Sequence, residues 1–265
     1  MKRCKLILGY SVFIIIILSV IVGPFISKVN PNTVNMMKIE NPPNIEALLG
    51  TDSMGRDVLA RLMEGGKISL TVGILATLAK LTVALMLGFI SAFFDRADSV
   101  IMRMCDVLMC FPFYVLAISM AAFIGPSVIN LIIIIVFFTF SMPTRLIRTE
   151  IRTIKDKEYI QILKLNNEKT LRILVNHIIP NLKNTILVIF TTSVAQAILM
   201  ESSLSFLGMG VQEPQASWGG MLSVTLNILN IQNRWWLWLP AGMMILSLVF
   251  SINLIGEELK DVRSK

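Results

Sequence analysis

Residues 145–183 read RLIRTEIRTIKDKEYIQILKLNNEKTLRILVNHIIPNLK and carry nine Lys/Arg against four Asp/Glu. This insert lies between two long apolar runs, in a chain of 265 residues that is 55% hydrophobic and only 15% charged. A soluble domain of this length usually has about 25% charged residues, so the deficit indicates a lipid environment. A segment this polar cannot lie in the hydrocarbon core itself, and we expect it to form a helical insert at the membrane surface.

Six apolar segments surround the insert, and each reaches or approaches the length of about 20 residues that a helix needs to cross a bilayer. They are Leu6–Ile26, Ile68–Phe94, Val100–Ile124, Ser127–Met142, Asn184–Leu207 and Trp236–Ile255. The first follows a basic start, but it is longer than the apolar part of a signal peptide and lacks a small-residue cleavage site. We therefore expect it to be a retained span. The third contains Pro112, which predicts a kink.

Basic residues are distributed unequally between the two sides that six spans define. If the N-terminus is inside, seventeen Lys/Arg fall on the side of the insert and both chain ends, and six fall on the other side. This excess predicts that the insert and both termini are cytoplasmic. It also accounts for most of the net charge of +7, so the charge does not require a nucleic-acid partner.

The predicted fold is therefore an all-α integral membrane protein with six transmembrane helices and cytoplasmic N- and C-termini. Residues 1–27 are expected to form an N-terminal transmembrane helix and residues 28–67 an extracytoplasmic loop. Residues 68–258 form the main transmembrane domain, including the insert, and residues 259–265 a cytoplasmic tail.

The insert has the pattern of two short helices. Ile147, Ile151 and Ile154 recur at helical spacing and predict a first helix with an apolar stripe. Asn167 interrupts the pattern, and because Asn tolerates positive φ and caps helix starts, we expect it to end one helix and cap a second over Glu168–His177. Such a basic amphipathic segment either lies on lipid or docks a soluble partner.

Three other blocks resemble a known family. They read LLGTDSMGRDVLARLMEGGKISL (Leu48–Leu70), MRMCDVLMCFP (Met102–Pro112) and ESSLSFLGMGVQEPQASWGGML (Glu201–Leu222). From about residue 48 to the C-terminus, the chain resembles the C-type permease subunit of bacterial ABC importers for dipeptides, oligopeptides and nickel. The insert corresponds to the cytoplasmic EAA–Gly loop of that family.

The family's signature residues have changed in this chain. Aligned on Pro180, the EAA positions are Gln161, Ile162 and Leu163, and the Gly position is Asn167. Loss of the Glu charge at an exposed position costs about 0–1 kcal/mol, and Asn can also adopt positive φ. The resemblance implies that this part of the insert contacts a partner ATPase. The residues expected to make this coupling contact are Glu158, Gln161, Ile162, Leu163, Asn167, Glu168, Thr170, Arg172 and Pro180.

The resemblance also implies an assembly. The fold would be a bundle like that of type I ABC importers, with a cytoplasmic coupling-helix loop, in the bacterial cytoplasmic membrane. The partners would be a second permease in a heterodimer, two cytoplasmic ATP-binding subunits, an extracytoplasmic substrate-binding protein and membrane lipid. The chain itself has no GxxxxGK[ST] phosphate loop, which fits a non-catalytic subunit. We predict no catalytic, cofactor-binding or metal-binding residue and no nucleic-acid partner.

Two ionisable residues within the apolar segments are candidates for a translocation path. Lys80 lies in the second segment and Glu201 in the fifth, and they could pair with each other. The alternatives are a Lys that extends to the interface and a Glu that lies near it. Arg103 and Asp106 are expected to form a local pair on one helix face.

Before the second apolar segment, Asp52 is expected to cap a short interfacial helix, with Gly50 and Gly55 as turn residues. The alternative for this region is a contact with the binding protein.

Competing functions remain open. A stand-alone transporter or channel would need no cytoplasmic insert of this size, and a membrane enzyme would need a catalytic cluster that the sequence does not contain. Within the resembling family, peptides are the expected substrate and nickel or a metal chelate is the alternative, because the binding protein sets most of the specificity.

Overall fold

The computed structural model describes residues 2–27 and 29–263. Regular structure in this part is helical, apart from an isolated bridge between Thr51 and Asp57. The longer helices are α1 (Lys2–Ser27), α2 (Val58–Phe93), α3 (Asp95–Met109), α4 (Phe113–Ile124), α5 (Val128–Thr139), α6 (Ser141–Lys155), α7 (Glu158–Leu165), α9 (Ile179–Phe206) and α12 (Leu239–Arg263). The shorter ones are η1 (Met36–Lys38), α8 (Thr170–Ile173), the π-helix η2 (Leu174–Ile178), α10 (Trp218–Leu222), η3 (Ser223–Leu226), α11 (Ile228–Asn233) and η4 (Trp235–Leu237).

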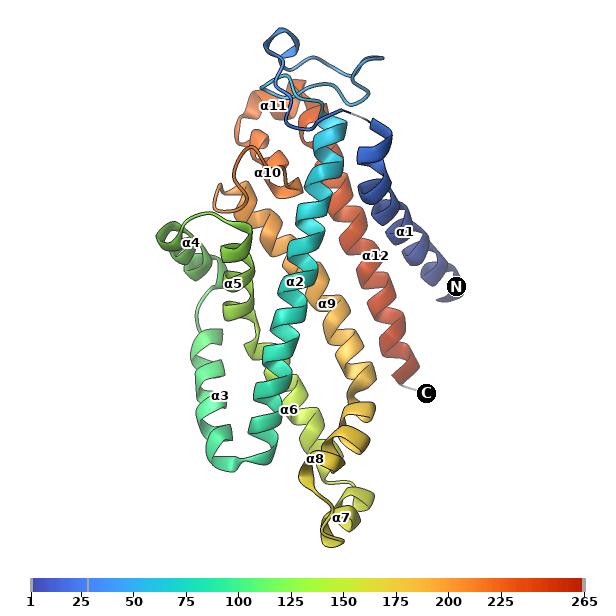
Figure 1. The fold of residues 1–265 in the computed structure, drawn as a ribbon, viewed down its shortest axis with the longest axis vertical. Helices are drawn as coiled ribbons and strands as arrows, with labels where there is room; N and C mark the ends of the chain where they lie inside the picture. Colours follow the sequence, from blue (N-terminus) through green and yellow to red (C-terminus); the bar gives the residue numbers. More distant parts are fainter. Residues whose placement is uncertain (1, 28, 264–265) are drawn as a thin grey trace.

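Four long helices form the centre of the molecule (Figure 1). Helix α9 packs against α2 and α12, and α1 packs against the same two helices. Each of the four contains a segment long and apolar enough to cross a membrane, and up to six crossings result if each of two bent helix pairs is counted as one. Helix α1 starts, and helix α12 finishes, on the side of the bundle nearer to α7 and α8 (Figure 1).

The third and fourth predicted spans are not single helices. Helices α3 and α4 meet at 89°, and α5 and α6 meet at 48°. Pro112 lacks an amide hydrogen and disfavours helical backbone in the residue before it, so α4 starts anew after the break. Pro143 directly follows the predicted fourth span and lies in the first turn of α6, where no intrahelical amide bond is needed.

Helix α2 begins at Val58, ten residues before the predicted start of the second span. Its cap is Asp57, whose side chain accepts a hydrogen bond from the Ala60 amide at 2.7 Å. The expectation that Asp52 is the cap was wrong, because Asp52 instead binds the backbone of the turn before the helix. That turn contains Gly55 at φ +70°, and Gly50 has φ +69°, as expected of turn residues.

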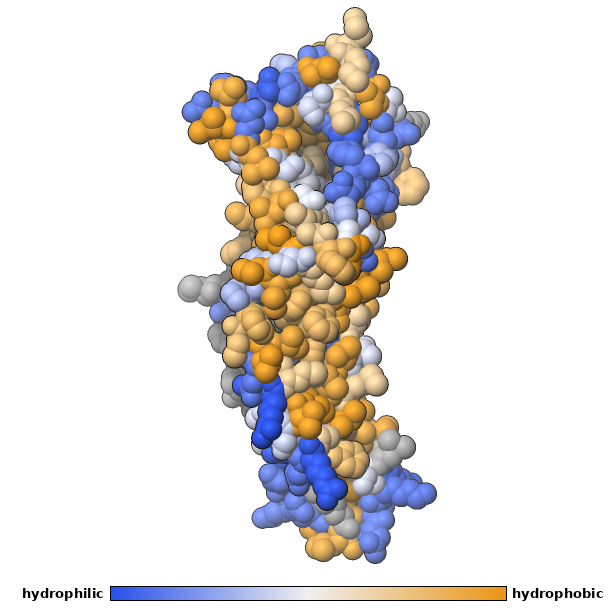
Figure 2. All heavy atoms as spheres, turned by 90° about the vertical axis from the view of Figure 1, so that its left-hand side faces the viewer, coloured by the Kyte–Doolittle hydropathy of each residue, from blue (hydrophilic) through white to orange (hydrophobic). Residues whose placement is uncertain are grey.

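The surface is apolar around its middle and polar at both ends. Figure 2 shows this arrangement on one side of the molecule. Many large apolar side chains are exposed in this structure, including Phe123, Ile129 and Phe137. A contiguous apolar surface of this extent is typical of contact with lipid.

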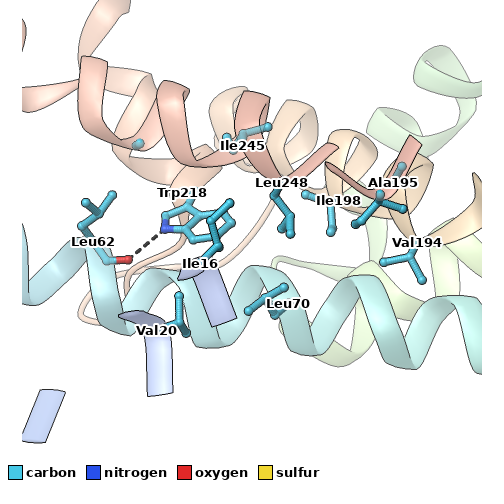
Figure 3. Packing of buried hydrophobic residues seen from close by; sticks show 12 residues of the cluster. Ile16, Val20, Leu62, Leu70, Val194, Ala195, Ile198, Trp218, Ile245 and Leu248 are labelled. Carbon is cyan, nitrogen blue, oxygen red and sulfur yellow. Dashed lines mark hydrogen bonds between the residues drawn. The ribbon is translucent and has the colours of Figure 1, made fainter. Parts of the chain in front are cut away.

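Trp218 of α10 anchors the segment between α9 and α12 to the bundle. Its side chain is fully buried, and its indole nitrogen donates a hydrogen bond to the Leu62 carbonyl at 2.8 Å (Figure 3). It packs in one cluster with Val20 of α1 and Ile245 of α12. Gly66 makes this possible, because a Cβ there would lie 2.7 Å from the Trp218 ring.

Candidate functional site

The insert folds into one end of the molecule, where α6, α7 and α8 meet the start of α9 (Figure 1). Ile147, Ile151 and Ile154 are almost fully buried, which confirms the predicted apolar stripe. They share a core cluster with Ile160 of α7 and Ile178 of η2. The short helices of the insert are therefore held by apolar contacts to both α6 and α9.

The turn of the insert is at the predicted position. Asn167 has φ +55°, the conformation expected from its place at the family's Gly position. The helix after it begins at Thr170, two residues later than predicted, and continues through η2 into α9. Pro180 lies in the first turn of α9, directly after the π-helix η2. Its missing amide hydrogen is therefore placed where the helix widens. The second half of the insert is thus continuous with the fifth span.

The predicted coupling residues are brought together on α7, the following turn and α8, apart from Pro180 on α9. Most are exposed, and the polar ones make only local contacts. Gln161 donates to the Lys155 carbonyl at 3.0 Å, and Glu168 pairs with Arg172 at 3.0 Å. Leu163 packs against the buried cluster, whereas Ile162 on the other face is 56% exposed. An exposed apolar face next to an exposed polar turn is a surface that a partner can cover.

Lys80 and Glu201 do not meet. Glu201 is completely buried, and its carboxylate accepts hydrogen bonds from Ser69 at 2.9 Å, Ser205 at 2.8 Å and Ser202 at 3.3 Å. Ser69 and Lys80 are eleven residues apart on α2, or about 16 Å along a helix axis. Glu201 therefore lies at the height of Ser69 and not of Lys80, and the pairing that the sequence left open is not formed.

Sequence analysis missed a charged cluster at the end of the bundle opposite the insert, which we call the outer arginine cluster. The outer arginine cluster consists of Asp52, Arg56, Arg61 and Glu213. Arg56 donates to Glu213 at 2.5 and 3.1 Å and to Asp52 at 2.7 Å. Arg61 donates to Glu213 at 3.0 Å, and both arginines are only 5% exposed. The cluster joins the turn before α2 to the loop after α9.

The environment of Arg56, which precedes α2, favours its charged guanidinium. Burial opposes the charge of Arg56, but its hydrogen bonds to Glu213 and Asp52 outweigh the burial, so its pKa lies above the ordinary value. The same four residues line a cavity of about 260 Å³ whose wall also includes Ser205 and Ser217.

A second missed cluster lies at the base of the insert, and we call it the inner Asp98 cluster. The inner Asp98 cluster consists of Ser91 of α2, Asp98 of α3, and Arg148 and Arg152 of α6. Asp98 accepts hydrogen bonds from all three other members. Asp98 is 50 and 54 residues from its two arginine partners in sequence, and only the acid–base complementarity of α3 and α6 hinted at the contact.

The expected pair of Arg103 with Asp106 was also wrong, because Asp106 instead pairs with Arg145 of α6. The missed Asp98 cluster and the wrong Arg103–Asp106 pair have the same cause. Helix α6 packs against α3, and its arginines bind the acidic side chains of α3.

Comparisons with known proteins identify the family of the chain. Residues 84–259 match the family described as binding-protein-dependent transport system inner membrane component. The chain is 33% identical over 262 residues to a Brucella suis biovar 1 (strain 1330) protein named as a peptide transport system permease, with 99% of this chain and 88% of the relative covered. It is 33% identical over 254 residues to the oligopeptide transport system permease protein OppC of Bacillus subtilis (strain 168), with 96% and 83% covered. The chain belongs to the family of inner-membrane components of binding-protein-dependent transport systems.

Proposed function

We propose that this chain is the pore-forming permease subunit of an ATP-driven importer of peptides. As a member of its family, it is a multi-pass component of the inner membrane. The observation that carries the proposal is the family match over residues 84–259, which includes the whole insert. Peptides are favoured as substrate because the relatives in Brucella and Bacillus that align with nearly the whole chain are named as peptide permeases.

The proposed topology has six crossings, with each bent helix pair counted as one. The insert and both termini lie in the cytoplasm, and the outer arginine cluster lies on the opposite side. The unequal distribution of basic residues supports this orientation. The direction in which α1 begins and α12 ends supports it as well (Figure 1).

The proposed partners are a second permease in a heterodimer, two cytoplasmic ATP-binding subunits and an extracytoplasmic substrate-binding protein. The insert docks in a cleft of one ATPase through α7, the turn at Asn167 and α8. Ile162 and Leu165, which are 56% and 80% exposed, supply apolar contact area there. When ATP closes the ATPase dimer, the insert moves as a rigid body and takes the spans with it.

For Lys80 and Glu201, the burial of both side chains within this one chain favours structural roles over direct lining of a path. Uptake by a Lys80→Met variant separates the two roles, because a path residue is needed for transport and a structural one only for folding. Normal uptake with normal amounts of protein would remove Lys80 from the path.

The proposed function is tested by purification and reconstitution. The chain is co-expressed with ATPase, permease and binding-protein subunits of a peptide importer from the same organism, and the assembled complex is placed in proteoliposomes. We expect co-purification of ATPase subunits and ATP-dependent uptake of radiolabelled trialanine. Uptake of radioactive nickel ions in place of trialanine would reassign the substrate, and uptake without ATPase subunits would refute the assembly.

The docking surface is tested separately in the same complex. A photo-crosslinking residue at Ile162 should link to an ATPase subunit. The matched control is Ile45, which is 99% exposed but lies in the loop at the other end of the bundle. Links from Ile45 and none from Ile162 would place the ATPases at the end of the bundle opposite the insert and refute the proposed docking surface.

A further inference from the structure

The base of the insert is bound to the first turn of α3 by ionic hydrogen bonds. The Asp98 side chain is only 14% exposed. It accepts two hydrogen bonds from the Arg148 guanidinium, one of them at 2.5 Å, and one from Arg152 at 2.8 Å. A fourth comes from the Ser91 hydroxyl. Two parallel bonds between a guanidinium and a carboxylate fix the relative orientation of the two groups as well as their distance.

A third basic residue of α6 extends the same contact. Lys155 donates to the Ala92 carbonyl at 2.6 Å and lies 4.7 Å from the centre of the Phe93 ring. Both partners are at the C-terminal end of α2, where unpaired helix carbonyls favour a cation. Arg148, Arg152 and Lys155 are spaced four and three residues apart, so they occupy one face of α6.

A neighbouring, apolar face of α6 packs both on α2 and on the rest of the insert. Ile147, Ile151 and Ile154 pack with the apolar side chains of α7, α8 and η2. Only two residues separate the end of α6 from the start of α7. Helix α6 therefore lies between the surface that docks the ATPase and the turn that starts α3.

Helix α3 has few other supports. It packs on α2 and α6, and it leads into α4 through the 89° break. An apolar contact between helices can slide by small steps, whereas a shielded ion pair with two parallel bonds keeps its geometry. A movement of α6 is thus passed to α3 through Asp98.

We propose that Asp98 is a positioning residue that couples the ATPase-driven movement of the insert to α3 and α4. The inference rests on the proposed function of the chain as an importer permease. It differs from a purely structural role, because loss of the link should disconnect ATP hydrolysis from transport while both the complex and its ATPase activity persist.

The test compares ATP hydrolysis and trialanine uptake in the same proteoliposomes. For Asp98→Asn we expect assembly and ATP hydrolysis within about two-fold of the wild type and uptake reduced at least ten-fold. The number of ATP molecules used per peptide then rises about ten-fold. Asp98→Glu retains the carboxylate and should restore a large part of the uptake.

The matched control is Asp95→Asn, on the same first turn of α3. The Asp95 side chain is fully exposed and lies 3.6 Å from Arg152, so its loss should leave the ratio of ATP to peptide within two-fold. A second variant, Arg152→Gln, weakens the cluster without leaving Asp98 unpaired, and should raise the ratio about three-fold. It decides the matter if Asp98→Asn fails to assemble.

The outcomes are distinguishable. An unchanged ratio in Asp98→Asn or, where that variant fails to assemble, in Arg152→Gln overturns the coupling role alone. Uptake and hydrolysis that fall in proportion also overturn it and leave a structural tether. A wild-type chain that neither binds ATPase subunits nor supports uptake refutes the proposed function, and the coupling role with it.

Discussion

The outer arginine cluster and the inner Asp98 cluster lie near opposite ends of α2 and have reversed charge patterns. In the outer cluster, two buried arginines are held by carboxylates from two loops, Asp52 and Glu213. In the inner cluster, one shielded carboxylate on a helix holds two arginines of another helix. Loops that are tied together become a fixed cap, whereas helices that are tied together can transmit a movement. We infer that the outer cluster mainly stabilises and the inner cluster mainly couples.

The largest effect on stability should come from the apolar anchor of the outer end. Trp218→Ala removes a fully buried side chain and its hydrogen bond to Leu62. We expect a loss of about 3–5 kcal/mol in the free energy of unfolding, measured by denaturant titration in detergent. Trp218→Phe should lose clearly less, because it keeps most of the packing. Equal losses for the two variants would mean that the hydrogen bond, not the packing, holds α10.

The next largest effect should come from the outer cluster itself. Arg56→Ala leaves Asp52, which is only 14% exposed, without its main partner. Breaking a buried pair by removing one partner costs about 3 kcal/mol or more, and uptake per folded complex should be unchanged. Arg56→Lys keeps the charge and should recover part of the stability. The recovery should be incomplete, because Lys cannot bind both carboxylates in the same geometry. A variant of normal stability that is defective in uptake would contradict the division between the two clusters.

A smaller effect is expected at the turn of the insert. Asn167 has positive φ, which Gly adopts freely and a β-branched residue adopts only with strain. Asn167→Gly should keep full uptake, and Asn167→Val should lose about 1–2 kcal/mol locally and reduce uptake by weakening ATPase binding. The affinity of the detergent-solubilised permease for the ATPase subunits measures this effect. Equal affinities for Gly and Val would show that the turn does not shape the docking surface.

The smallest effect should come from the exposed pair of Arg145 and Asp106, which also joins α6 to α3. Their side chains are 41% and 57% exposed, so Asp106→Asn should change the free energy of unfolding by less than about 1 kcal/mol. The ratio of ATP to peptide should remain normal. A ratio raised as far as in Asp98→Asn would mean that any link between these helices couples, and that shielding of the Asp98 cluster is unimportant.

Much of the fold could be predicted because its signals are local. Apolar run length located the four helices that are long enough to cross a membrane, and the stripe of Ile147, Ile151 and Ile154 predicted the first helix of the insert. Asn167 was identified as the turn from its residue type alone. Helix ends were less accurate, since α2 begins at Val58, and the residue that caps it, Asp57, is one of several nearby polar residues that could do so.

Amino-acid order by itself determined that this is a helical membrane protein with a basic insert, because hydropathy and charge act on each segment separately. Only the tertiary structure decided that α3 and α4 meet at 89°, that three serines in place of Lys80 donate hydrogen bonds to Glu201, and that Asp98 binds the arginines of α6. These features depend on which helices become neighbours and at what height. An acidic side chain can pair about equally well with any of several nearby arginines. The packing of the whole bundle selects the arginine that it meets.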